Sequence, residues 1–304
     1  MVGELSSLGS AAAWSLAIVL FRRAADVPAL TINLFKNVVA LVLMLGTMAA
    51  LGLSFDTQRT SEDFVRLLVS GALGLGIADA IFLRALKRMG PGLAAIVETA
   101  YAPSVILFAV VLNGEAMGLG FWLGTPIVLG GVLVATEAWR ALGLGAARVG
   151  DQESRGGLTL GQGVGLGVLA IVCMALGIVI AKPALERAHV IEAAVWRMLG
   201  ALGVQCAIAC TSAARRRSFA VFLSPLAWRQ ILPSALLGAY IAMMLWLAGM
   251  KFAPASVAAV LGQTSTIFTL VFARLLYAEK LTRHRIVGAA LACGGAIVLV
   301  ATHQ

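Results

Sequence analysis

Two stretches of the chain follow one pattern: residues 84–95 read RALKRMGPGLAA, and residues 247–258 read LAGMKFAPASVA. Each stretch joins the end of one apolar segment to the start of the next, with a proline at the junction. Further along, residues 130–136 read GGVLVAT and residues 294–302 read GGAIVLVAT, in the same order. The two halves of the chain therefore look like copies of one unit.

The composition excludes a water-soluble globule. Of the 304 residues, 61% are hydrophobic and only 12% are charged, whereas a soluble domain usually has about 25% charged residues. Apolar runs of roughly 20 residues, each long enough to cross a bilayer as a helix, cover nearly the whole sequence. We predict an all-α integral membrane protein with ten transmembrane helices at residues 5–21, 29–52, 64–86, 91–113, 117–139, 160–181, 190–212, 230–250, 254–277 and 284–302.

Each copy contains five of these helices. The first repeat spans residues 1–139, a polar linker spans residues 140–159, and the second repeat spans residues 160–304. Because five is odd, the second repeat starts from the opposite face, and a pseudo-two-fold axis in the membrane plane relates the two. Inverted repeats of this kind can open a central site to either side in turn. The pattern predicts a secondary transporter that works by alternating access.

Cations in the loops predict the orientation. With Lys36 and Arg197 set aside as intramembrane, 16 Lys and Arg residues fall on one face and 5 on the face that holds both termini. By the positive-inside rule, both termini lie outside the cytoplasm of a bacterial-type plasma (inner) membrane. The net charge of +9 needs no nucleic-acid partner, because the cations lie in short loops and not in a stripe with interleaved aromatic residues.

Ionisable residues at membrane depth usually face a cavity or a partner. Lys36, Asp79 and Glu98 fall at a similar depth from the basic face. Arg197 is the repeat partner of Lys36 and enters from the other face, where Gln263 replaces Glu98. At the depth of Lys36, the cation therefore has two carboxylates near it. At the depth of Arg197, the cation has only the amide of Gln263. A substrate carboxylate could complete the set at the depth of Arg197, because a guanidinium forms two parallel hydrogen bonds with a planar anion.

Aromatic residues add an apolar element to this predicted site. Four of them are predicted deep enough to line a cavity: Trp14, Tyr101, Tyr240 and Trp246. Arg197 would bind a carboxylate, Glu98 or Asp79 would receive an ammonium group or carry a proton, and the aromatic rings would hold a side chain. This combination fits an amino acid, aromatic ones included.

Structural roles compete with these assignments. Lys36 with Glu98 or Asp79 could be an ion pair that only locks helices. Arg197 could extend to the membrane surface or donate to backbone carbonyls. Within transport, the alternative substrates are lipophilic drugs, organic cations or another small metabolite, with Glu98 as the cation site.

The order of these features resembles the EamA-type branch of the drug/metabolite transporter superfamily, including its exporters of aromatic and other amino acids. The resemblance rests on the two five-helix halves, AAAWS at residues 11–15, a cation in the second helix of each half, and Glu115 and Glu279 before the last helix of each half. It implies export or exchange of small metabolites through a central cavity. The first four helices of each half would line that cavity, and the fifth helices would be peripheral.

Other classes of function fit less well. No histidine pairs with a buried serine or cysteine at a catalytic spacing, so we predict neither an enzyme nor a cofactor or metal site. No ring of polar residues indicates a channel. The expected partners are a small-molecule solute and the lipid bilayer, with the protein acting as a monomer or a homodimer.

Overall fold

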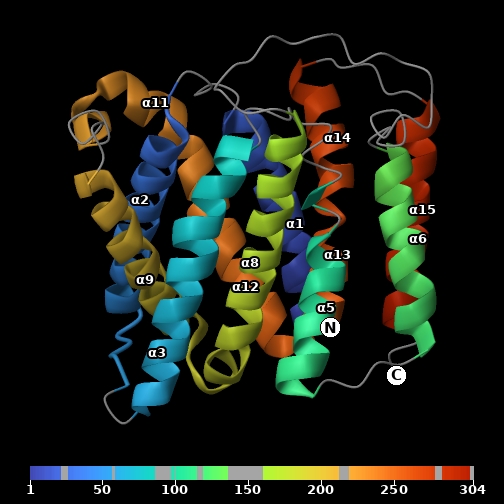
Figure 1. The fold of residues 1–304 in the computed structure, drawn as a ribbon, viewed down its shortest axis with the longest axis horizontal. Coiled ribbons are helices and arrows are strands. Elements are labelled where there is room, and N and C mark those ends of the chain that lie inside the picture. Colours follow the sequence, from blue (N-terminus) through green and yellow to red (C-terminus); the bar gives the residue numbers. More distant parts are fainter. Residues whose placement is uncertain are drawn as a thin grey trace.

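The computed structural model describes residues 1–21, 27–56, 59–85, 97–98, 100–114, 119–135, 160–211, 219–277 and 283–301. These residues form an upright helical bundle without a strand among them (Figure 1). The predicted linker at residues 140–159 and the two glutamates Glu115 and Glu279 lie outside the described residues.

The described part of each half forms five helical segments. The first half has α1 (Val2–Phe21), α2 (Ala29–Ala50), α3 (Ser61–Ser70) continued by the π-helix η2 (Gly71–Ala78) and a last turn to Ala85, α5 (Tyr101–Asn113) and α6 (Leu119–Ala135). The second half has α8 (Leu160–Arg187), α9 (Val190–Thr211), α11 (Pro225–Ser234) continued by the π-helix η4 (Ala235–Ala242) and α12 (Met243–Phe252), α13 (Ala255–Gly262) with α14 (Ser265–Tyr277), and α15 (Arg283–Ala301).

The all-α fold with ten membrane helices in two repeats is confirmed, although several helix ends differ from the prediction. Among the described residues, seven helices are long and apolar enough to cross a membrane, and α5, α6 and α15 complete the set. α8 continues past the predicted end at residue 181 to Arg187. α3 and α11 begin earlier than predicted because the side chains of Thr60 and Ser224 cap their first turns, accepting from the N–H groups of Asp63 and Ala227.

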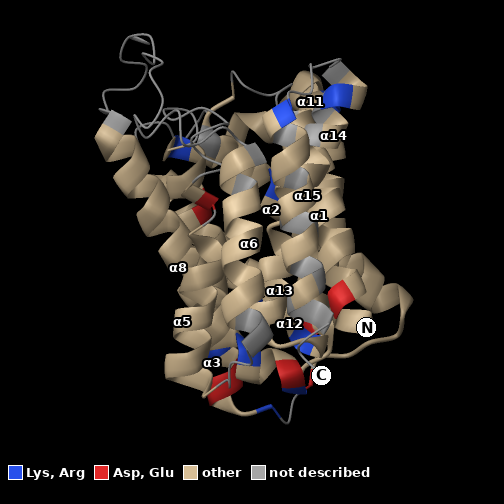
Figure 2. Ribbon diagram, turned by 90° about the vertical axis from the view of Figure 1, so that its right-hand side faces the viewer, with Lys and Arg blue, Asp and Glu red and all other residues tan. Residues whose placement is uncertain are grey.

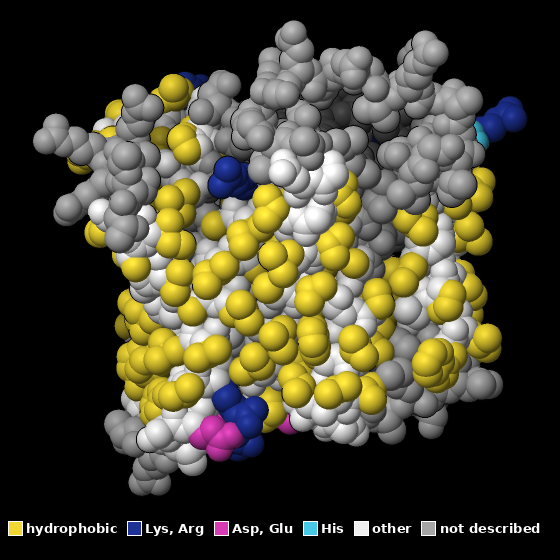
Figure 3. Space-filling view, in the orientation of Figure 1, with side chains coloured by type: hydrophobic (Ala, Val, Ile, Leu, Met, Phe, Trp, Pro, Cys, Tyr) yellow, Lys and Arg dark blue, Asp and Glu magenta, His cyan; other side chains and the backbone are white. Residues whose placement is uncertain are grey.

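The surface suits a lipid environment. Apolar side chains cover the middle of the face shown in Figure 3, and charged side chains appear at its edges. Acidic and basic residues gather mainly toward the two ends of the bundle (Figure 2). The start of α1 and the end of α15 lie at the same end of the bundle, which is drawn lowest in Figure 1. We call this end the lower face. An even number of membrane crossings requires this arrangement.

α6 and α15 pack against each other at one side of the bundle (Figure 1). A glycine permits their close approach, because a Cβ atom at Gly295 would lie 2.6 Å from the backbone nitrogen of Val128. These two fifth helices contribute no residue to the central cavity described below. They are peripheral, as the family resemblance implies.

The other helices form two packed groups, each drawn from both halves of the chain. α1 packs with α11, η4, α12, α13 and α14, whereas η2 and α3 pack with α8 and α9, and α8 also packs with α5. α2 lies between the groups and contacts both η4 and α9. We call the first set the α1 group and the second set the α8 group.

Within the α8 group, α9 lies unusually close to α3 and η2. A Cβ atom at Gly71 would lie 1.8 Å from the carbonyl oxygen of Arg197, and one at Gly200 would lie 2.1 Å from the carbonyl oxygen of Leu68. Small residues are what allow membrane helices to approach backbone to backbone. This contact fixes the part of α9 that carries Arg197.

The two π-helical segments occupy equivalent places in the two repeats, at the middle of the third helix of each. A π-helix is rare and often marks a functional site, because its i→i+5 bonding disturbs the ordinary ladder. In η2 the carbonyl of Leu75 accepts hydrogen bonds from Nδ2 of Asn33 at 3.2 Å and from Nε2 of Gln205 at 3.1 Å. Side chains from α2 and α9 thus hold the irregular segment in place.

Candidate substrate cavity

A cavity of about 210 Å³ lies at the centre of the bundle. This volume is far larger than the ~10–15 Å³ that one water molecule needs. Its walls come from α1, α2, η2, α5, α8, α9, η4, α12, α13 and Ser265 of α14, so both helix groups contribute. The cavity therefore lies at the boundary between the two groups, where an inverted-repeat transporter places its substrate.

Eight of the nine predicted site residues line this one cavity: Trp14, Lys36, Asp79, Glu98, Tyr101, Arg197, Trp246 and Gln263. Tyr240 is not among its lining residues. The Tyr240 hydroxyl lies instead 2.5 Å from Oγ1 of Thr47 on α2, and its ring packs against the apolar core. The structure brings the eight side chains together, and their role in binding or coupling stays a prediction.

Lys36 pairs with Asp79 inside the cavity wall. Its ammonium lies 2.5 Å from Oδ2 of Asp79, and the two side chains are only 6% and 8% exposed. The ammonium also lies 6.0 Å from the centre of the Trp14 ring. The sequence predicts Asp79 and Glu98 at the same depth as Lys36, so either could have been its partner. In the structure, Lys36 pairs with Asp79.

Glu98 lines the same cavity without an ion pair to any described residue. Both nearby cations have other contacts, because Lys36 is bound to Asp79 and Arg197 to Ser70. Glu98 is thus the carboxyl group that can receive a cation or a proton from the cavity.

Arg197 is buried deep in α9, with 1% of its surface exposed. Its Nη1 atom donates to Oγ of Ser70 at 2.6 Å, and the guanidinium lies 5.3 Å from the centre of the Trp246 ring. Its Nε atom is buried without a hydrogen-bond partner among the described residues, and no described carboxylate forms an ion pair with it. The alternative in which Arg197 extends to the membrane surface is excluded by this burial.

Lys36 and Arg197 lie at different depths in the membrane. Lys36 lies about seven residues, or roughly 10 Å, from the start of α2, and Arg197 lies about as far from the start of α9. α2 and α9 start at opposite faces, because the repeats are inverted. In a hydrocarbon core of about 30 Å the two levels are therefore separated by roughly 10 Å.

Beside the cavity, the described part of the fourth helix of each repeat contains a turn. Residues 97–98 are helical, Ala100 is in a turn, and α5 then begins at Tyr101. In the second repeat, α13 ends at Gly262 and a turn at Gln263 and Thr264 precedes α14. Such discontinuous helices commonly form substrate sites in inverted-repeat transporters, because their free backbone groups face the cavity.

Sequence reasoning missed these turns and two further residues. The signal was present, since polar residues cluster at both positions, as ETAY at residues 98–101 and QTST at residues 263–266. The two missed residues are Ser70, which accepts a hydrogen bond from Arg197, and Asn37, which lines the cavity. Nδ2 of Asn37 is buried without a hydrogen-bond partner among the described residues. Nothing in the sequence separates these two from other buried polar residues.

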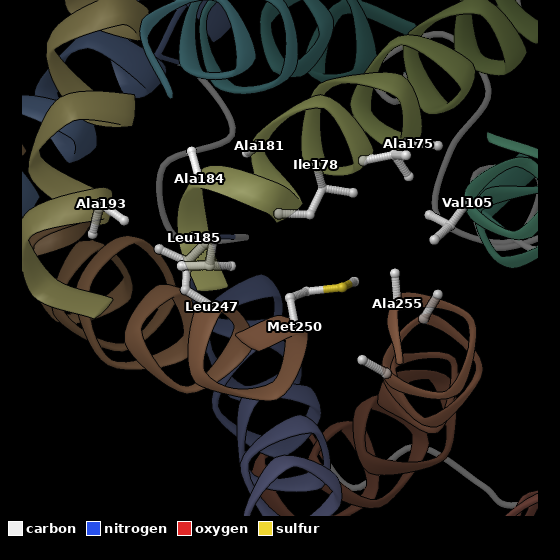
Figure 4. Packing of buried hydrophobic residues seen from close by; sticks show 14 of the residues in the cluster. Val105, Ala175, Ile178, Ala181, Ala184, Leu185, Ala193, Leu247, Met250 and Ala255 are labelled. Carbon is white, nitrogen blue, oxygen red and sulfur yellow. The ribbon is translucent and has the colours of Figure 1, made fainter. Parts of the chain in front are cut away.

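Packed apolar side chains lie on the lower-face side of the cavity lining, after Met174 on α8 and Trp246 on α12. Figure 4 shows Ile178 and Leu185 of α8 facing Leu247 and Met250 of α12, with further buried residues from α5, α9 and α13 around them. Lys182 of α8 is buried beside this layer, and its ammonium donates to the carbonyl oxygen of Met250. We call this layer the apolar floor.

Comparison with known proteins supports a transport fold. The model of the EamA-like transporter family matches residues 1–136 and 161–301. A solved structure titled "Crystal structure of protein" is similar with a TM-score of 0.75, covering 99% of this chain and 97% of that chain, at 17% sequence identity. This likeness concerns the fold alone. No curated protein matches the sequence.

Proposed function

Because the chain belongs to the EamA-like transporter family, and is therefore a membrane transporter of small molecules, we propose that it exports or exchanges amino acids, aromatic ones included. The proteins of this family are transporters and not enzymes.

Arg197 is the main reason for proposing a carboxylate in the substrate. A buried arginine without a carboxylate partner is unfavourable unless a ligand supplies the missing charge for part of the cycle. Ser70 orients the guanidinium from one side, and Trp246 packs on it from another. The guanidinium is thus held in place to bind a planar anion through charge-assisted hydrogen bonds.

The charges that line the cavity favour a zwitterion. The described lining residues contain two cations, Lys36 and Arg197, and two carboxylates, Asp79 and Glu98. Lys36 and Asp79 neutralise each other, so Arg197 and Glu98 remain as separate poles of opposite sign. A ligand with a carboxylate and an ammonium group matches these two poles and leaves no net charge in the membrane.

Aromatic residues suit the rest of the ligand. Trp14, Tyr101 and Trp246 line the cavity, and Tyr101 lies three residues after Glu98 in the chain. Aromatic rings offer a large apolar surface with one polar edge each. An apolar or aromatic side chain would therefore lie against them while the charged end of the amino acid binds Arg197.

Glu98 is the group that we propose for coupling. A single carboxyl without a fixed partner can bind a substrate ammonium group in one state and a proton in another. Exchange of the two would couple amino-acid export to proton entry. Asp79 is less suitable, because its carboxylate already has Lys36 as a fixed partner.

The working unit in this proposal is one chain, alone or in a homodimer, in a bacterial-type inner membrane with both termini outside the cytoplasm. Labelling of a cysteine introduced at the exposed Ser54 tests the orientation, because an impermeant reagent added outside intact cells should reach it. Labelling only after lysis would reverse the orientation.

A lipophilic organic cation is the second candidate, and the unpaired Glu98 favours it. Lys36 is no obstacle to such a ligand, because Asp79 neutralises it. Arg197 is the obstacle, since its charge has no partner among the described residues. Counterflow in proteoliposomes separates the candidates: exchange of labelled amino acids that Arg197→Ala abolishes supports the first, and exchange of a labelled organic cation that survives Arg197→Ala supports the second.

A further inference from the structure

Two lysines at the lower face bind the ends of each other's helices. Nζ of Lys182, on α8, donates to the carbonyl oxygens of Met250 at 2.8 Å and Ala253 at 3.0 Å, at the end of α12. Nζ of Lys251, on α12, donates to the carbonyl oxygen of Ala188, directly after the end of α8. We call this reciprocal contact the lysine clasp.

The chemistry of helix ends explains the contact. The last carbonyls of a helix have no partner within the helix and carry the negative end of its dipole, so a cation that donates to them is favourable. Lys182 is only 5% exposed and needs such partners. It also lies 3.1 Å from the half-exposed carboxylate of Glu186 on the same helix.

The clasp joins helices that belong to different groups. α12 packs mainly on α1, and α8 packs mainly on α5, η2 and α3. Both helices line the cavity higher up, through Met174 on α8 and Trp246 on α12. Below it they meet at the apolar floor (Figure 4). A path from the cavity to the lower face along this boundary requires α8 and α12 to separate where the clasp holds them.

Two other ionic contacts at this face do not cross that boundary. Nη2 of Arg59 lies 2.6 Å from Oε2 of Glu192, and Arg187 binds Asp63 through both of its carboxylate oxygens. These pairs connect α3 and its preceding loop to α8 and α9, all within the α8 group. They stabilise that group and can stay intact while the groups move apart.

We propose that the lysine clasp is the gate of the lower face, which keeps the apolar floor closed and releases when the cavity opens to that side. The two ammonium groups gain water molecules as they leave the carbonyls, so the exchange of partners has a small net free energy. The gate can thus open and close reversibly. Opening a buried ion pair would cost more free energy, because separation leaves two buried charges without a partner.

The gate lies on the same helices as the predicted substrate contacts. Trp246, which packs on the guanidinium of Arg197, lines the cavity and lies on α12, the helix that also carries Lys251. The contact between Trp246 and Arg197 also crosses from one helix group to the other. A ligand that bound Arg197 would compete with this contact and weaken the boundary. Only this link depends on the proposed substrate.

Accessibility of the cavity tests the gate without knowledge of the substrate. In a variant without the 4 native cysteines, Ser265→Cys places a thiol in the cavity wall, and its rate of labelling by an impermeant maleimide from the lower face is measured in proteoliposomes. Ser54→Cys, on the exposed loop of that face, identifies which side is labelled. Lys182→Met and Lys251→Met should each accelerate labelling at least about tenfold, the effect of losing a charge-assisted hydrogen bond.

Two controls separate the clasp from other causes. Lys182→Arg keeps the cation and its donors and should label as slowly as the parent. Arg66→Met removes a cation from the exposed pair with Glu62 at the same face and should also label slowly. Equal labelling rates for both lysine variants and the parent, or equal acceleration by Arg66→Met, would overturn the proposal.

A cross-link gives a second test if a lysine variant fails to fold. Leu185 of α8 and Leu247 of α12 belong to one buried cluster, their helices are in contact, and Figure 4 draws the two side chains near each other. A disulfide between Leu185→Cys and Leu247→Cys should hold α8 and α12 together. Labelling of the cavity cysteine from the lower face should then stop and resume on reduction. Labelling that continues at the parent rate with the disulfide formed would contradict a gate at this position.

Discussion

Lys36 neutralises one of the two cavity carboxylates, because its ammonium lies 2.5 Å from Oδ2 of Asp79 in a wall where neither side chain exceeds 8% exposure. This pair holds α2 to the turn that follows η2. It also decides the electrostatics of the cavity, since Glu98 is left as the free carboxyl and Arg197 as the free cation among the described lining residues.

Removing one partner of this pair should destabilise the protein. Asp79→Asn leaves the Lys36 ammonium buried without its counter-charge, and such a loss typically costs about 3–5 kcal/mol. The apolar double variant Lys36→Met with Asp79→Leu should recover most of that stability, because it leaves no charge unpaired. Thermal unfolding in detergent measures both. Equal stability of Asp79→Asn and the parent would mean that the pair contributes nothing to folding.

Neutralising Glu98 should remove the dependence of transport on pH. Glu98→Gln keeps the size and hydrogen-bonding groups of the side chain but cannot carry a proton. Substrate exchange by the parent should vary with pH, and exchange by the variant should be flat over the same range. Glu62→Gln, at an exposed carboxylate of the lower face, serves as the control. An unchanged profile for Glu98→Gln would remove this residue as the proton carrier.

Ser70 should be required to position Arg197. Ser70→Ala removes the hydrogen bond to Nη1, and exchange at low substrate concentration should fall about tenfold, the usual effect of losing one hydrogen bond to a charged group. Ser234 provides a matched control, because it ends α11 as Ser70 ends α3 and is equally buried. Among the described residues, its hydroxyl donates to the carbonyl oxygen of Ile231 in its own helix. Ser234→Ala should transport at the parent rate, and equal loss in both variants would argue against a specific role for Ser70.

The close contact between α3 and α9 should not tolerate a methyl group. In Gly71→Ala the new Cβ would lie 1.8 Å from the carbonyl oxygen of Arg197, so the two backbones must move apart. Unfolding should occur at a temperature several degrees lower, and transport should fall because Arg197 moves with its helix. Gly46→Ala on α2 meets no atom within 4 Å and should be neutral or slightly stabilising. Similar behaviour of the two variants would show that the contact is not rigid.

Much of the fold follows from hydropathy and the repeat. The apolar runs predict helices because only helices satisfy the backbone in lipid at this length, and charged residues inside them indicate a cavity. Eight of the nine predicted residues meet in one cavity for this reason. Their depths could be estimated from the rise per residue of a helix.

Other features depend on packing that a single sequence does not reveal. Sequence depth places Tyr240 near the cavity, but the direction of its side chain depends on packing, and its hydroxyl lies beside Thr47 while its ring packs against the apolar core. Lys36 could have reached either Asp79 or Glu98 at the same depth, and tertiary packing decides between them. The lysine clasp depends on how far α8 continues, and the predicted end at residue 181 excluded Lys182 from the helix.

Counterflow in proteoliposomes is the most direct test of the proposed function. Vesicles that contain the protein are loaded with one unlabelled amino acid, and the entry of labelled aromatic and aliphatic amino acids is followed for the parent and for Arg197→Ala. We predict entry that depends on the loaded amino acid and that Arg197→Ala reduces at least about a hundredfold, because the carboxylate loses a bidentate charged partner. Folded parent protein that exchanges no amino acid, or an Arg197→Ala variant that exchanges amino acids at the parent rate, would contradict the account.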